Sequence, residues 1–122
     1  MNHAHNSEIV VLSFGFKFGL PRANYYFDVT FLKNPARLNA ATLTSLVDDA
    51  MFDYVVSQPE AQKVLDITFE LAVTVSDIPA DCVLAFGCNS GRHRSHVMAT
   101  ALAKRLEESG RRVHCEHRDL GA

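Results

Sequence analysis

The sequence has few cysteines and no long apolar run, and these two absences narrow the class of protein. Only three of its 122 residues are cysteine, without the pair spacing of a metal site, which argues against a disulfide framework and for a reducing compartment. No apolar stretch reaches the length of a membrane span, and the first seven residues are too polar for a secretory signal. We therefore expect a cytoplasmic protein without membrane contact, with residues 1–7 as a flexible tail and residues 8–122 as one domain.

Two nucleotide-binding signatures are also missing. The chain contains neither a P-loop nor a G-x-G-x-x-G dinucleotide fingerprint, and it has no internal repeat or low-complexity segment. The formal net charge of −2 argues weakly against a general nucleic-acid binder, but the charge is unevenly distributed. From residue 88 onward, seven lysines and arginines stand against four acids, and four of the six histidines lie there too. This asymmetry indicates an anionic ligand at one end of the molecule.

Apolar periodicity predicts alternating strands and helices. Short β-prone runs predict strands over residues 8–16, 25–32, 82–86 and 112–117. Helical spacing predicts one helix from residue 39 to 54, a second over 59–75, and a third that ends at residue 109 before a glycine. A strand, a helix and a strand in this order form a βαβ unit, whose strands are parallel. The fold class expected is α/β, with a small mixed or parallel sheet flanked by helices.

The stretch from residue 88 to 95, here named the 88–95 loop, carries most of the functional signal. It joins a predicted strand to a predicted helix, a place where free backbone N–H groups and the helix dipole attract anions. Its glycine lets the backbone approach a ligand, and its arginines match phosphate oxygens in pairs. A solvated basic helix start is the plain alternative, but positive charge there is unfavourable unless an anion compensates it. The predicted ligand residues are Cys88, Asn89, Ser90, Gly91, Arg92, His93, Arg94 and Ser95.

Two residues elsewhere are candidates for the same site. Lys17 follows the first predicted strand, and the carboxyl ends of parallel strands share one edge of a sheet. Asp28 lies inside a predicted strand, where aspartate is disfavoured, so we expect it to have a cationic or hydroxyl partner. The carboxylates of the first two helices are interpreted as a solvated face without chemistry.

An enzyme is the second hypothesis, because the loop also fits the C-x5-R-[ST] pattern of cysteine-dependent phosphatases. Cys88 would be the nucleophile and Arg94 the phosphate clamp. Gly87 stands where those enzymes usually have a histidine, and no general-acid aspartate loop is evident. A cysteine at a strand end is more often a small buried residue, so we expect no phosphatase activity. A third hypothesis is a structural subunit that only assembles with other chains and whose 88–95 loop is the remnant of an anion site.

Four separated motifs in the same order resemble the C-terminal domain of the RapZ family, the RNase adapter proteins. They are S-F-G-F-K-F-G-L-P at 13–21, F-D-V-T-F-L-K-N-P at 27–35, the segment 87–95, and H-R-D-L at 117–120. The resemblance implies an α/β domain similar to part of phosphofructokinase. In the best-known members of the family, this domain binds small regulatory RNA and senses glucosamine-6-phosphate. By position it implies that the 88–95 loop is the ligand loop, supported by Lys17, Asp28, His117 and Arg118. It implies no cofactor and no metal.

Several positions depart from the family pattern. Departures occur at Thr30, where arginine is usual, at Lys33, where proline is usual, and at Phe18, Asn89, Ser90 and His96. The cations of the loop remain, so we expect a regulatory module for a phosphorylated small molecule, with RNA as an alternative ligand. The family's N-terminal P-loop domain has no counterpart in this chain, so no ATP or GTP hydrolysis is implied. The sequence specifies neither the ligand nor the oligomeric state, and it is compatible with a homo-oligomer.

Overall fold

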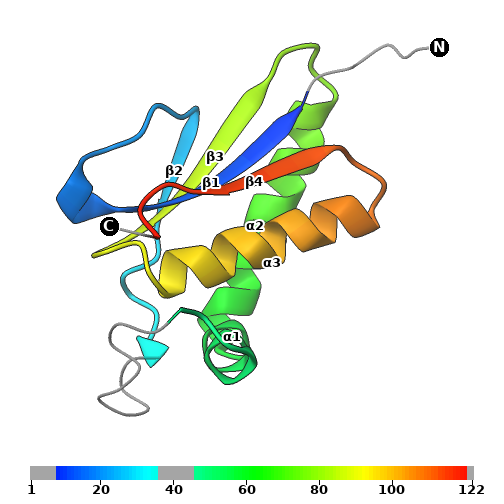
Figure 1. The fold of residues 1–122 in the computed structure, drawn as a ribbon. Coiled ribbons are helices and arrows are strands. Elements are labelled where there is room, and N and C mark those ends of the chain that lie inside the picture. The colour runs from blue at the N-terminus through cyan, green and yellow to red at the C-terminus, as the bar shows by residue number, and fades with distance from the viewer. Residues whose placement is uncertain (1–7, 36–45, 121–122) are drawn as a thin grey trace.

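A four-stranded, fully parallel sheet is the centre of the computed structural model, which describes residues 8–35 and 46–120 (Figure 1). Its strands are β1 (Ile9–Gly15), β2 (Tyr25–Asp28), β3 (Cys82–Cys88) and β4 (Val113–His117), in the order β2-β3-β1-β4. The helices are α1 (Asp49–Val56), α2 (Pro59–Ser76) and α3 (Arg94–Glu108), and a 3-10 turn, η1 (Phe16–Phe18), follows β1. The predicted α/β class is confirmed, and the sheet is parallel rather than mixed.

The two central strands, β1 and β3, are the most apolar segments of the sheet. All but one residue of each is buried, as expected for parallel strands whose two faces are covered. Their register pairs Ile9 with Cys82 at one end and Gly15 with Cys88 at the other. The predicted loops after these two strands therefore start side by side, at the carboxyl edge of the sheet.

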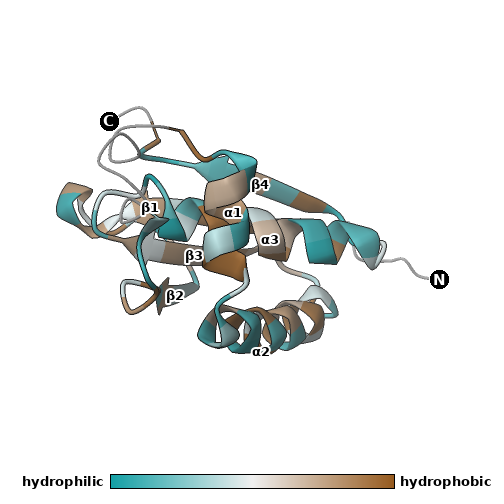
Figure 2. Cartoon of the chain, turned by 90° about the horizontal axis from the view of Figure 1, so that it is seen from below, coloured by the Kyte–Doolittle hydropathy of each residue, from teal (hydrophilic) through white to brown (hydrophobic). Residues whose placement is uncertain are grey.

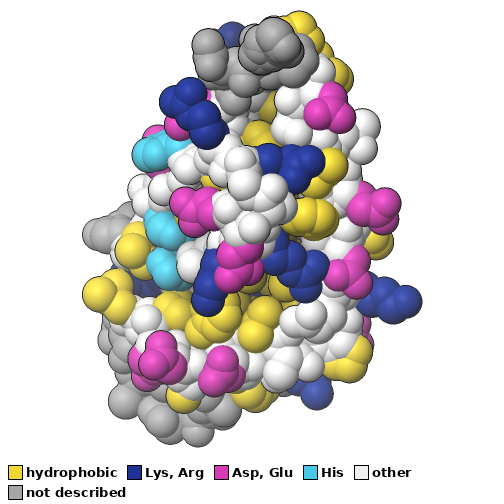
Figure 3. Space-filling model, turned by 90° about the vertical axis from the view of Figure 1, so that its right-hand side faces the viewer, with side chains coloured by type: hydrophobic (Ala, Val, Ile, Leu, Met, Phe, Trp, Pro, Cys, Tyr) yellow, Lys and Arg dark blue, Asp and Glu magenta, His cyan; other side chains and the backbone are white. Residues whose placement is uncertain are grey.

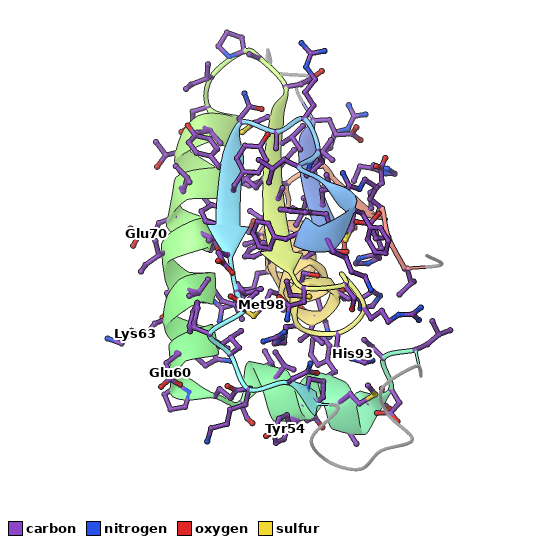
Figure 4. The ribbon with its side chains drawn as sticks, turned by 90° about the vertical axis from the view of Figure 1, so that its left-hand side faces the viewer. Tyr54, Glu60, Lys63, Glu70, His93 and Met98 are labelled. Atoms are coloured by element: carbon purple, nitrogen blue, oxygen red, sulfur yellow. The ribbon has the colours of Figure 1, made fainter. Side chains whose placement is uncertain are left out.

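Helices α2 and α3 cover one face of the sheet, where the main core lies, and α1 packs against both helices beyond the ends of the strands (Figure 4). Strand side chains such as Val11, Leu84 and Phe86 pack there against apolar side chains of α2 and α3. The apolar stripe predicted for α2 is confirmed, and Figure 2 shows hydrophilic residues alternating with hydrophobic ones along that helix. The buried members of the stripe are Ala61, Leu65, Thr68, Ala72 and Val75. No helix that the structure describes is long and apolar enough to cross a membrane.

The opposite face of the sheet carries a smaller core, formed by Leu12, Phe14 and Ala85. The connection from β1 to β2 covers it. The ring of Phe14 is fully buried and makes edge contacts with Phe16 and Tyr26, at ring-centroid distances of 4.9 and 6.3 Å. The segment that follows β1 is therefore tied to the sheet by aromatic packing.

The predicted strand over 25–32 is too long, because β2 ends at Asp28. The Asp28 carboxylate accepts hydrogen bonds from the backbone N–H of Thr30 at 2.9 Å and from its hydroxyl at 2.7 Å. Such local bonds compete with the sheet ladder and turn the chain. The hydroxyl partner expected for Asp28 is thus Thr30, two residues further along the chain.

The first predicted helix begins later than the periodicity indicates. Residues 46–48 are not helical, and α1 starts at Asp49. Asp48 is the N-cap, because its carboxylate accepts the backbone N–H of Met51 at 2.8 Å. The part of the prediction over 39–45 lies outside the described residues, as does the predicted tail over 1–7.

Candidate anion-binding site

The predicted ligand residues come together at the carboxyl edge of the sheet, where β1, β3 and β4 end (Figure 1). The backbone N–H of Lys17 donates to the carbonyl of Asn89 at 3.2 Å, so the turn after β1 lies against the 88–95 loop. His117, at the end of β4, stacks on His96 of α3. The predicted convergence of separate motifs is therefore a feature of the fold, while the assignment of these residues as ligands stays a prediction.

Two glycines allow the 88–95 loop to lie directly on the end of β1. Gly91 has φ +78°, a conformation that side chains rarely adopt, and a Cβ there would lie 2.7 Å from the Gly15 nitrogen. A Cβ on Gly15 would lie only 2.4 Å from the carbonyl carbon of Ser90. The backbone of the loop therefore packs directly on the backbone at the end of β1, which fixes the position of the loop relative to the sheet.

The start of α3 is electropositive. The side chain of its N-cap residue, His93, makes no cap hydrogen bond to the helix, and the first turn contains no acid. Both Arg94 and Ser95 lie in that first turn, and the positive end of the helix dipole adds to the arginine charge. Figure 4 shows His93 near this end of the molecule, close to α1. This arrangement favours an anion at the loop.

Arg94 is 8% exposed and donates from one guanidinium nitrogen to the carbonyls of Thr30 at 2.5 Å and Leu32 at 3.2 Å. Its Nε is buried without a hydrogen-bond partner. Among the described residues, no carboxylate forms an ion pair with this guanidinium. Arg94 therefore links α3 to the segment after β2 and keeps an uncompensated charge.

Cys88 is buried beneath the loop, with 2% of its surface exposed. Its Sγ lies 3.1 Å from the hydroxyl of Ser95 and accepts the Ser95 backbone N–H at 3.4 Å. A nucleophile needs an open path to its substrate, and a cysteine that is only 2% exposed does not offer one. The position suits a small packing residue that also satisfies a helix N–H group.

Asp119 is a residue of this site that sequence reasoning did not select. It is 7% exposed, and its carboxylate accepts the backbone N–H of Gly15 at 2.7 Å and three hydrogen bonds from Arg118. Burial alone would raise the pKa of Asp119, but the bonds from Arg118 and Gly15 and the Arg118 charge hold this pKa below its usual value. The signal was its position in the H-R-D-L motif, one residue after a predicted cationic ligand.

Two stacked imidazoles, His96 and His117, form a neutral layer beside the loop. Their ring centroids are 3.8 Å apart, and Figure 3 shows histidine side chains next to each other on this side of the molecule. Burial, followed by the charges of His117 and His93, lowers the pKa of His96 to about 4, and burial lowers the pKa of His117. His117 Nδ1 lies 2.6 Å from the hydroxyl of Ser13, which is fully buried and so inaccessible to a substrate.

Asp28 lies at the same edge but borders a separate feature. It lines a cavity of about 300 Å³ between β2 and α2, and no residue of the 88–95 loop lines that cavity. The remaining lining residues are Tyr26, Phe27, Val29, Val64, Ile67 and Thr68. Over residues 8–35 and 46–120, no group of three or more histidine, cysteine, aspartate or glutamate side chains is placed to hold a metal ion.

A parallel α/β sheet with a glycine-containing, basic loop at a helix start defines this chain as an α/β domain with a candidate anion site. Comparison with protein families matches residues 7–121 to the RapZ C-terminal domain. The chain belongs to this family.

Relatives of known sequence agree with this assignment. A nucleotide-binding protein of Rhodospirillum rubrum is 39% identical over 126 residues, which cover 98% of this chain and 40% of that protein. A nucleotide-binding protein of Carboxydothermus hydrogenoformans is 38% identical over 118 residues, which cover 92% of this chain and 41% of that protein. The chain thus spans about 40% of the length of these relatives.

Proposed function

We propose that this chain is a regulatory binding domain that holds a phosphorylated ligand at the 88–95 loop. The observation that supports it most is the buried guanidinium of Arg94, whose Nε has no partner, at a helix start whose first turn contains no acid. A buried charge without a counter-ion is costly, and a phosphate at this point compensates the charge and interacts favourably with the positive end of the helix dipole.

The ligand that we propose is an amino-sugar phosphate such as glucosamine-6-phosphate. The resemblance of the four motifs to the RapZ family is the basis for this choice. The relatives from Rhodospirillum rubrum and Carboxydothermus hydrogenoformans are named nucleotide-binding proteins, which supports a ligand that carries phosphate. A nucleotide is therefore the first competitor to test against the sugar phosphate.

Titration calorimetry and amide chemical shifts test this proposal together. Inorganic phosphate and glucosamine-6-phosphate should both bind and shift the amide signals of Gly91 to Arg94, whereas glucosamine without phosphate should not. Adenosine monophosphate, run in parallel, reports whether a nucleotide is preferred. No heat and no shift at these amides with any of the phosphates at millimolar concentration would refute the site.

RNA is a second candidate ligand, supported by two exposed aromatic rings beside the loop. Phe16 and Phe18 are 37% and 43% exposed, and Lys17 lies between them with its ammonium 5.2 Å from the Phe18 ring centroid. Aromatic rings next to cations stack on unpaired bases. Binding of a single-stranded RNA that weakens steeply between two salt concentrations would favour RNA, because each phosphate contact releases counter-ions.

We further propose that the chain has no phosphatase activity. The Cys88 thiol lies against Ser95 and is 2% exposed, so it lacks the approach that in-line attack on phosphorus needs. Incubation with p-nitrophenyl phosphate should release no nitrophenol above the buffer rate. Turnover that disappears in Cys88→Ser would instead establish the enzyme hypothesis.

A further inference from the structure

Residues 118 and 119, which follow β4, bond to β1 at two points and to the residue after η1. The backbone N–H of Arg118 donates to the Ser13 carbonyl at 3.0 Å, which extends the pairing of β4 with β1. Its guanidinium donates to the carbonyl of Gly19 at 2.6 Å, at the end of η1. The Asp119 carboxylate accepts the backbone N–H of Gly15 at 2.7 Å.

Asp119 also lies directly against the 88–95 loop. A Cβ built on Gly91 would be 3.3 Å from the Cβ of Asp119 and 2.7 Å from the nitrogen of Gly15. The carboxylate, the Gly15 amide and Gly91 are therefore stacked in one small volume. A shift of Asp119 moves the surface on which the loop rests.

The neighbouring Arg118 guanidinium compensates the negative charge of the Asp119 carboxylate. Arg118 donates from Nε to both carboxylate oxygens at 3.0 and 3.1 Å, and from a terminal nitrogen at 2.9 Å. An unpaired carboxylate at this distance from Gly91 would repel an anion in the loop, because charges in a buried place are weakly screened. The Arg118 guanidinium also lies 5.7 Å from the Phe14 ring centroid, which holds it on the small core.

We infer that the Arg118–Asp119 pair positions the 88–95 loop for its anion, an inference that rests on the proposed function. Asp119 fixes the loop by holding the Gly15 amide beneath Gly91. Arg118 fixes the η1 turn and neutralises Asp119, so that the carboxylate supports the loop without repelling the ligand. Both are positioning residues, because they act through Gly15, Gly19 and Gly91 rather than on the phosphate.

A set of four variants, titrated with inorganic phosphate, tests the pair. Asp119→Ala removes the acceptor for Gly15 and should weaken phosphate about tenfold or more, whereas Asp119→Asn keeps an acceptor and should stay within about threefold of the parent. Arg118→Ala leaves a buried unpaired carboxylate and should lose about tenfold in affinity. The double variant R118A/D119N removes that carboxylate and should recover most of the loss.

The recovery in the double variant separates positioning from ordinary structural support. Two residues that merely stabilise the fold would give additive or larger losses, so a double variant weaker than Arg118→Ala would overturn the inference. Arg105→Ala is the matched control. It breaks the ion pair at 2.8 Å between Arg105 on α3 and Asp66 on α2, and it should leave phosphate binding unchanged.

Amide hydrogen exchange of Gly15 gives a second readout that needs no ligand. This amide donates to the Asp119 carboxylate at 2.7 Å, so it should exchange faster in Asp119→Ala and stay protected in Asp119→Asn. If the parent protein binds no phosphate, the proposed function fails. Unchanged exchange in Asp119→Ala would separately show that Asp119 does not hold the Gly15 amide. Faster exchange with unchanged phosphate affinity would show that this hydrogen bond does not serve the site, which also overturns the inference.

Discussion

The guanidinium of Arg94 has two carbonyl partners on the protein and a buried Nε without a partner, so its removal affects both the fold and the ligand. Arg94→Ala should weaken inorganic phosphate by about ten- to a hundredfold, the value of a charge-assisted contact of about 1.5–3 kcal/mol. It should also lower Tm, because the carbonyls of Thr30 and Leu32 lose their donor. Arg94→Lys keeps the charge but not the forked guanidinium, so its phosphate affinity should lie between that of the parent and that of Arg94→Ala.

Arg112→Ala is the control for this prediction. Arg112 is exposed and lies beyond the far end of α3, about 22 Å from its start at 1.5 Å rise per residue. The Debye length is about 8 Å at physiological salt, so its charge is screened from the site. Equal losses of phosphate affinity in the Arg94 and Arg112 variants, measured by calorimetry on folded protein, would exclude the 88–95 loop as the site.

The stacked histidines predict a pH dependence of stability. The pKa of His96 is about 4 in the folded protein, against about 6.5 for a free histidine. Because the unfolded chain binds the proton more tightly, the stabilisation is complete above about pH 6.5 and is lost as pH falls toward 4. The full shift corresponds to about 3 kcal/mol, which solvent screening of the half-buried ring reduces to about 1–2 kcal/mol.

Urea unfolding at pH 7 and pH 4.5 measures this loss. His96→Val should show a smaller decrease in the free energy of unfolding between the two values, and His114→Val, at an exposed position of β4, should decrease like the parent. An unchanged decrease in His96→Val would place the acid sensitivity elsewhere, with His117 as the next candidate because burial also lowers its pKa.

Single residues of the site were only partly readable from the sequence. The strand–glycine loop–helix pattern predicted where Gly91 and Arg94 would lie, since it depends on local order alone. The hydrogen bond from Gly15 to Asp119 and the hydrogen bond from Arg94 to Thr30 depend on how segments distant in sequence meet. Hydrogen bonds of that kind leave no periodic or compositional trace, so Asp119 was missed.

At the scale of elements, the contact between β1 and the 88–95 loop depends on glycine. Gly91→Ala should destabilise the protein by more than about 2 kcal/mol and abolish phosphate binding. The new Cβ would lie 2.7 Å from the Gly15 nitrogen, and the alanine would also have to adopt φ +78°. Gly110→Ala is a matched change at φ +91° with no atom within 4 Å, and should cost only about 1 kcal/mol.

Thermal unfolding and phosphate titration of both variants decide this point. Similar losses of stability in the two variants would mean that backbone conformation alone matters and that the close approach of the loop to β1 does not.

The ends of two other elements are set by local side-chain hydrogen bonds. Asp28 and Asp48 end or begin their elements through side-chain hydrogen bonds to Thr30 and Met51, which explains why apolar periodicity overran both boundaries.

The order of the strands is a property of the whole molecule that local patterns do not specify. Periodicity predicted the number and type of elements and the parallel arrangement of the last two strands. It did not place β1 between β3 and β4, because that order depends on which strand faces fit together after the helices have packed. The shared edge of parallel strands predicted that Lys17 would lie near the 88–95 loop, whereas only the resemblance of separated motifs brought His117 to the same site before the structure did.

Every strand pair in this sheet joins distant parts of the chain. Ile9 pairs with both Cys82 and Val113, and Tyr25 pairs with Leu84. A fragment of residues 8–80 lacks the partner of both β1 and β2, so it should show neither strand signal by circular dichroism nor a cooperative melt. A fragment of residues 8–120 should show both, and a cooperative melt of the shorter one would contradict this view of the fold.

During synthesis on a ribosome, the same topology delays the pairing of β1 until β3 has been made. The apolar strand at residues 9–15 leaves the exit tunnel well before its first partner, the strand Cys82–Cys88. Domains emerge at about 5–20 residues per second, so this strand stays without a partner for several seconds. Nascent chains of this domain should therefore be substrates for chaperones that bind apolar segments, until β3 emerges and covers β1.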